Sequence, residues 1–377
     1  MARRQTFTLI AIAFLLIISF TQAQAVEIKW GKVPDSVWQL GAPESNPGVD
    51  AVVVLSKGQL TVNRDQIVLH HHVRIKVLTD AGVELAGEQA VRWHKKHDKM
   101  KGLKAHTLTS DGQKHKVEKD AMFERSVEDY REKVFTFPNV AAGSILEYRY
   151  EIYSERFFYL EPWYFQSELY TYRSELSVEL RENFDYTVLY TNVPGRFRTP
   201  EVKEQINASN PLAPITIYSW HMVDIPPLSD EPYMAAIDEF RSAIRFQLVG
   251  YKDRYHTISF TKTWEELGGQ VQDYVDEFCD KRSTVKEMTV QITDGLTTPE
   301  EKSRAIFEHV AREFRTTYDI SSIYSESSLS DLLKERAGSP TSKNLLLVEM
   351  HRAAGIEAWP VLLGTRDHMF FDPQVRD

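Results

Sequence analysis

Residues 67–77 have the sequence IVLHHHVRIKV, in which one set of alternate positions is mostly apolar. That set consists of Ile67, Leu69, His71, Val73, Ile75 and Val77. A period of two is typical of a strand that buries one face. The segment is followed by Asp80-Ala81-Gly82, a sequence that favours a turn. We therefore predict a half-buried strand here, with His71 on its core face.

The same period of two continues on both sides of this strand, from about residue 52 to residue 190. Residues 145–152 and 176–180 alternate in the same way. Ser110-Asp111-Gly112 separates two further short strands, as a hairpin turn would. Many short strands with turns between them favour an all-β sandwich or a related layered sheet.

After residue 261 the apolar period becomes that of helices. Thr298-Pro299-Glu300-Glu301 combines a capping residue, a proline at the first helical position and two acidic residues, and so marks the start of a helix. We predict further helices over residues 264–279, 329–336 and 342–354, and an apolar strand over residues 358–363. The predicted fold class is therefore α+β.

The first residues have the pattern of a secretory signal. Arg3 and Arg4 precede an apolar run over residues 7–20, and Ala23-Gln24-Ala25 supplies the small residues that signal peptidase requires. Cleavage between Ala25 and Val26 would give a periplasmic or secreted protein with no stable membrane span. The apolar run is shorter than the ~20 residues that span a bilayer. An uncleaved N-terminal anchor is the alternative.

Charge and cysteine content limit the classes of partner. The chain has a net charge of −9, and loss of the leader's two arginines makes the mature part more acidic. This argues against nucleic acid and against anionic membrane surfaces as main partners. Basic runs such as residues 99–104 are interpreted as a solvated face. Cys279 is the only cysteine, so no internal disulfide can form.

Several segments carry a resemblance to known domains. FTFPNV at 135–140, GSILEYRY at 143–150 and DEPYM at 230–234 resemble a β-rich bacterial domain of unknown function (DUF3857-type). Downstream, residues 345–350 and RAAGI at 352–356 resemble a transglutaminase-like core. The predicted parts are a signal peptide (1–25), the β-sandwich-like domain (26–225), connector strands (226–260) and a partial papain/transglutaminase-like α+β core, incomplete at its C-terminus (261–377).

The resemblance implies a particular catalytic arrangement. In transglutaminase-like and papain-type enzymes a cysteine at the N-terminal end of a buried helix attacks an amide carbonyl, assisted by a histidine that an acid or amide orients. The cysteine follows a glycine by two positions. Counted from Gly338, that position is Pro340, which has no nucleophile and no backbone N–H. The nucleophile slot is thus predicted to be degenerate, as in a pseudoenzyme.

Other residues are weaker candidates for the chemistry. Thr341 and Ser342 have hydroxyls at the same helix start, but helix capping is the favoured interpretation. Cys279 shares an apolar helix face and is expected to be a buried structural cysteine. The family's histidine and acid are expected on strands after Asp377, so we assign no role to Asp367, His368 or Asp372.

Two other groups of residues could form binding sites. His70 and His72 share a strand face and are weak candidates for metal ligands, but no cysteine or ordered carboxylate accompanies them, so we predict no metal site and no cofactor. The aromatic residues at 157–159 and 163–165 could line a groove; packing in the core is the favoured interpretation.

Two functions from different classes remain open. The first is a non-catalytic cell-envelope protein that binds or scaffolds a peptide, protein or glycan through its β domain and its degenerate cleft. The alternative is an amide-bond enzyme (a cysteine peptidase, a transglutaminase-like hydrolase or a transamidase) with an unusual nucleophile or with catalytic residues in a missing C-terminal part. Pro340 favours the first, and a structural module is a weaker third possibility. The oligomeric state does not follow from the sequence.

Overall fold

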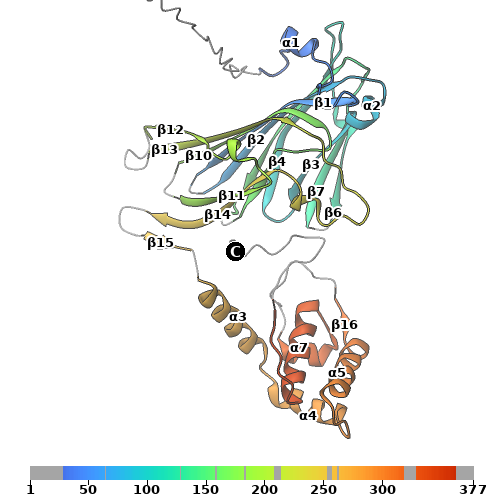
Figure 1. Ribbon diagram of the computed structural model, residues 1–377, viewed down its shortest axis with the longest axis vertical. Helices are drawn as coiled ribbons and strands as arrows, with labels where there is room; N and C mark the ends of the chain where they lie inside the picture. The colour runs from blue at the N-terminus through green and yellow to red at the C-terminus, as the bar shows by residue number, and fades with distance from the viewer. Residues whose placement is uncertain are drawn as a thin grey trace, which may run out of the picture.

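The computed structural model describes a large β-rich part followed by a helical part (Figure 1). It covers residues 29–361 apart from 64, 128, 158, 182–183, 208–213, 253–256, 261–262 and 318–327. The predicted signal peptide and its cleavage site therefore lie outside the described residues. No helix in this part of the chain is long and apolar enough to cross a membrane.

An eight-stranded sheet forms the base of the β-rich part, in the order β12-β13-β10-β1-β2-β8-β4-β5. The strands are β1 (Ala51–Val62), β2 (Ile67–Val77), β4 (Asp98–Leu108), β5 (Lys114–Lys116), β8 (Ile145–Ser154), β10 (Tyr170–Leu180), β12 (Glu201–Gln205) and β13 (Ile215–Ile225). Neighbours are antiparallel except β1 and β10, which are parallel. The predicted strand at 67–77 is confirmed, and so is the hairpin turn at 110–112, which joins β4 to β5.

Two smaller sheets cover one face of this base. One consists of β3 (Glu88–His94), β7 (Tyr130–Thr136) and β6 (Met122–Val127); in the other, β14 (Ala243–Lys252) pairs with β9 (Tyr159–Tyr164), β11 (Phe184–Thr191) and β15 (Thr257–Ser259). Val73 and Ile75 of β2 share a core with Phe135 of β7, whereas Ile67 of the same face shares a second core with Ile244 of β14. The β-rich part is thus a layered sandwich with two cores.

Short helical turns complete the β-rich part. They are α1 (Asp35–Trp38), α2 (Ala81–Ala86) and the 3₁₀ turns Lys119–Ala121, Gly195–Phe197 and Ile237–Glu239. The segment 226–260, predicted as connector strands, contains the strands β14 and β15. Its strand β14 lies between β11 and β9, because its apolar side chains Ile244 and Phe246 fill the second core.

In the described residues of the helical part, five helices pack around one core. They are α3 (Trp264–Phe278), α4 (Arg282–Ile292), α5 (Pro299–Glu313), α6 (Leu329–Glu335) and α7 (Pro340–Ala353); the two-residue strands β16 (Arg315–Thr316) and β17 (Ala337–Gly338) pair in parallel. Capping boxes start α3 at Thr263 and α5 at Thr298, and the helix start predicted from Thr298-Pro299-Glu300-Glu301 is confirmed. Helix α4 was not predicted, because it lacks a side-chain cap.

Two predictions for the end of the chain need correction. Helix α7 begins at Pro340 rather than at residue 342, because Ser339 caps it and proline suits the first helical position. Residues 358–361 are not in a strand, since no described strand pairs with them, and Trp359 and Val361 are exposed.

Candidate functional site

The start of α7 is the place where the resemblance puts a nucleophile. Pro340 is the first helical residue, and the Ser339 hydroxyl accepts a hydrogen bond of 3.1 Å from the Ser342 backbone N–H. The Oγ atoms of Ser339 and Ser342 are 3.0 Å apart. The cap is therefore Ser339, and Thr341 and Ser342 lie inside the first turn rather than capping it, which corrects the expectation from the sequence.

Close packing just before α7 explains why position 338, two residues before Pro340, is a glycine. A Cβ on Gly338 would lie 2.6 Å from Cδ1 of Leu332 in α6 and 3.2 Å from Cβ of Ser342. Both neighbours are fully buried. Gly338 thus lets α6 and the start of α7 approach each other closely, and this approach fixes the position of Pro340.

Thr341 and Ser342, the two hydroxyl residues that could replace the missing cysteine as nucleophile, differ in their exposure to solvent. Ser342 has no exposed surface, so its hydroxyl cannot reach a substrate in this structure. Thr341 is only half-buried. His351 is about 15 Å away along the same helix, at 1.5 Å per residue. It contacts the Leu347 carbonyl and the Ser303 hydroxyl. His351 therefore cannot activate Thr341 as a base.

Cys279 follows the last turn of α3 and lies in the core, as expected from its apolar helix face. Only 4% of its surface is exposed. Burial, and then the nearby carboxylate of Glu349, raise the pKa of the Cys279 thiol to about 12. The thiolate is the nucleophilic form, so this cysteine is chemically inert in the folded protein.

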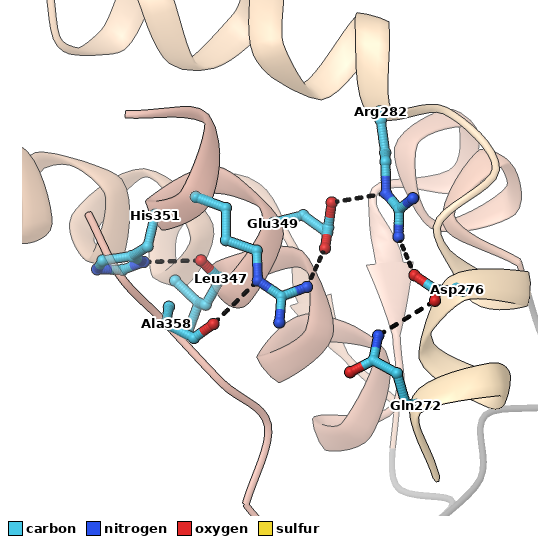
Figure 2. A network of polar contacts seen from close by, with 8 residues as sticks. Gln272, Asp276, Arg282, Leu347, Glu349, His351 and Ala358 are labelled. Carbon is cyan, nitrogen blue, oxygen red and sulfur yellow. Dashed lines mark hydrogen bonds and ion pairs between the residues drawn. The ribbon is translucent and has the colours of Figure 1, made fainter. Parts of the chain in front are cut away.

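Figure 2 shows a polar network that joins α3, α4 and α7. Glu349, which is almost buried, accepts from Arg282 Nε at 3.1 Å and from Arg352 Nη1 at 2.9 Å. Arg282 also pairs with Asp276 of α3. Each charged side chain of this network, as far as the structure describes it, is paired with one of opposite charge, which is typical of a structural network. The network therefore offers no unpaired acid or base for catalysis.

The three consecutive histidines of β2 point to different surroundings. His71 lies on the core face, as predicted, with Nε2 2.9 Å from Ser56 Oγ and Nδ1 2.7 Å from the Tyr150 hydroxyl. His70 is exposed and has Nδ1 3.3 Å from Glu151, whereas His72 has Nε2 2.8 Å from Glu147. The two candidate metal ligands therefore engage different carboxylates. The described ranges contain no group of three or more His, Cys, Asp or Glu that could hold a metal.

A buried charge cluster on the outer face of the large sheet was missed at the sequence level. Glu147 of β8 is fully buried and contacts Arg74, His72 and His106, whose Nε2 is 3.0 Å away. Burial alone would raise the pKa of Glu147, but these three partners outweigh it and hold that pKa well below its usual range. The strand register brings the partners together, because Glu147 pairs with Arg74 on one side and His106 on the other.

The segment 29–38 covers this cluster. The backbone N–H of Gly31 donates to Glu147 Oε2 at 2.8 Å, and Arg74 donates to the carbonyls of Lys29 and Lys32. The Trp30 ring lies edge-on to His106, at 4.5 Å between centroids. Residues just after the predicted leader are thus an integral part of the β-rich fold.

Three of the aromatic residues expected to pack in the core do so, whereas the half-buried Tyr164 donates to Asp238 instead. Trp163 and Phe165 are buried in the second core, and Phe157 stacks on Phe184. Phe158 and residues 362–377, which include Asp367, His368 and Asp372, lie outside the described residues.

Comparisons with known proteins agree with this architecture. Residues 63–229 match the family described as a domain of unknown function with a solved structure (DUF3857), and residues 286–369 match the transglutaminase-like superfamily. No curated protein matches the sequence.

Among solved structures, the chain is similar to a crystal structure from Parabacteroides distasonis described as a "putative protease". The TM-score is 0.58 at 16% sequence identity, and the similarity covers 82% of this chain and 59% of the other. At this identity the likeness concerns the fold. The chain thus has a β-rich DUF3857 domain followed by a transglutaminase-like domain, in an α+β fold.

Proposed function

We propose that this chain is an exported cell-envelope protein whose transglutaminase-like domain is non-catalytic and serves to bind or scaffold a peptide, protein or glycan. The observation that carries the proposal is Pro340 at the first position of α7, where the family's arrangement places its nucleophile. Export is proposed from the leader pattern, and N-terminal sequencing of the native protein, with Val26 expected first, tests it.

The surroundings of Pro340 support loss of chemistry with retention of the fold. Proline starts the helix without strain, so the nucleophile is lost at no cost to packing. Ser342 is buried and Cys279 is held protonated in the core. A domain that keeps its shape without its nucleophile retains binding, because binding and chemistry are separable.

The alternative is an amide-bond enzyme, in line with the description of the Parabacteroides structure as a "putative protease". Because this chain spans 59% of that chain at 16% identity, the other protein's activity is only a hypothesis here. Such an enzyme would need an unusual nucleophile, of which Thr341 is the accessible candidate.

Replacing Pro340 with cysteine tests the assignment of the slot. A thiol there would lie at a helix N-terminus, where the helix dipole lowers its pKa. Pro340→Cys should therefore react with iodoacetamide at lower pH than the unfolded protein does. The wild type should stay unreactive while folded, since its only thiol is buried.

The matched control is Pro299→Cys, which places a thiol at the same position of α5 outside the candidate site. Because the same helix dipole acts on both thiols, Pro340→Cys should react at least as readily as Pro299→Cys. If only Pro299→Cys reacted at lowered pH, the thiol at position 340 would be inaccessible and the slot wrongly assigned. Peptide hydrolysis or transamidation by the wild type that disappears in Thr341→Ala would overturn the non-catalytic proposal and establish the alternative.

A further inference from the structure

A hollow of about 700 Å³ opens on the β-rich domain, and all of its lining residues belong to that domain or to the segment before it. It lies between β4, β5, the residues that follow β5, and Trp30 of the covering segment. Its lining includes six lysines, Arg149 and His106 but only one acidic residue, Glu118. The whole chain is acidic, with a net charge of −9, so this gathering of cations does not reflect composition.

Most of these cations have no acidic partner. Within the part of the chain that the structure describes, Lys133 pairs with Glu124 at 3.8 Å, whereas Lys104, Lys116, Lys119 and Arg149 make no ion pair. The charge of Glu147 beneath them does not compensate, because Arg74 already matches it. Like charges that share a concave surface repel one another, and a bound anion relieves that repulsion.

Aromatic contacts hold two of the cations in place. The Arg149 guanidinium lies over the Trp30 ring at 4.6 Å from its centroid, and Lys114 Nζ lies 5.6 Å from the same centroid. Trp30 is itself fixed against His106, and the neighbouring Gly31 N–H is bound to Glu147. The cations are therefore positioned before any ligand arrives, which lowers the entropic cost of binding.

From this geometry we infer that the hollow binds a small ligand with two or more phosphate groups, either free or as the headgroup of a lipid. Lysine ammonium groups act as point charges on phosphate oxygens, and arginine adds a planar fork of donors. Met100, Leu103 and Met122 offer apolar surface to the uncharged part of the ligand. An extended polyanion such as nucleic acid would meet the acidic remainder of the protein and be repelled. The inference does not depend on the state of the transglutaminase-like domain.

Calorimetric titration of the full chain with pyrophosphate tests the inference. We expect binding that weakens with added salt and that falls about tenfold or more in Lys104→Gln/Lys116→Gln. The matched control is Lys96→Gln/Lys99→Gln, which removes the same charge from the adjoining β3–β4 hairpin and from β4, outside the hollow, and should bind as the wild type does. All four lysines are exposed, so both variants should fold.

A second titration, with lipid vesicles, distinguishes a phosphorylated lipid headgroup from a free phosphorylated ligand. Tighter binding to vesicles of a polyprenyl diphosphate in phosphatidylcholine than to pyrophosphate would identify a lipid headgroup; the reverse order would identify a free ligand. The inference is overturned if neither probe binds or if both double variants lose affinity equally. It is also overturned if an oligonucleotide binds more tightly than pyrophosphate with the same dependence on Lys104 and Lys116. None of these outcomes bears on the reactivity of Pro340→Cys.

Discussion

At the scale of single residues, His71 shows how a polar side chain is accommodated on a core face. Its ring packs against Tyr150 and Trp163, and both ring nitrogens have partners in Ser56 and Tyr150. Neutral imidazole has one donor and one acceptor nitrogen, which these two hydroxyls can match. Burial, and then the charge of His72, lower the pKa of His71 from 6.5 to about 3.

This lowered pKa predicts loss of stability in mild acid. Below pH 6.5 the unfolded chain binds a proton at His71 that the folded chain does not, so the free energy of unfolding falls as the pH decreases from about 6.5 to about 3. Between pH 7 and pH 5 the expected loss is about 2 kcal/mol, measurable by urea unfolding.

The control for this prediction uses the neighbouring histidine. His71→Gln removes the titration and should flatten the dependence on pH, although it lowers stability at neutral pH by disturbing the core. His70→Gln changes an exposed neighbour on the same strand; it controls for the substitution itself and should keep the wild-type stability at neutral pH. A wild-type slope in His71→Gln would show that the acid sensitivity has another source.

At the scale of elements, the approach of α6 to α7 depends on the absence of a side chain at Gly338. We expect Gly338→Ala to destabilise the protein by about 1–3 kcal/mol, because its Cβ would overlap the buried Leu332. Thermal unfolding followed by circular dichroism measures the change.

Gly269 in α3 is the matched control, because a Cβ there meets nothing within 4 Å. Gly269→Ala should raise stability by about 0.5–1 kcal/mol, since alanine loses less backbone entropy than glycine on forming a helix. Equal effects of the two substitutions would mean that α6 and α7 can move apart without cost.

At the scale of the whole molecule, the β-rich and helical parts bury separate cores that share no residue. We therefore expect them to unfold separately. Ile75→Ala and Leu346→Ala each empty space in one core and should each cost about 2–5 kcal/mol. Scanning calorimetry should show Ile75→Ala moving only the transition of the β-rich part and Leu346→Ala only that of the helical part. A single transition that both substitutions shift would contradict this independence.

Local patterns in the sequence were sufficient wherever a short segment sets its own structure. The alternation at 67–77, the turn at 110–112 and the helix start at 298–301 depend on neighbours a few residues apart, and the structure has each of them. The order of a β-rich domain and a transglutaminase-like domain was likewise predicted from the sequence, and Pro340 at the nucleophile slot stays a prediction for experiment.

Tertiary structure decided what depends on strand register and on distant segments. Five segments far apart in the sequence meet around Glu147 and the lysine-rich hollow: residues 29–31, 72–74, 104–106, 114–116 and 147–149. They meet because β2, β8, β4 and β5 are neighbours in one sheet. Pairing with β11 and β9 in a separate sheet brings β14 into the second core. Periodicity along the chain specifies which face a side chain takes, whereas pairing between strands, set by the packing of the whole core, specifies which side chains lie opposite one another.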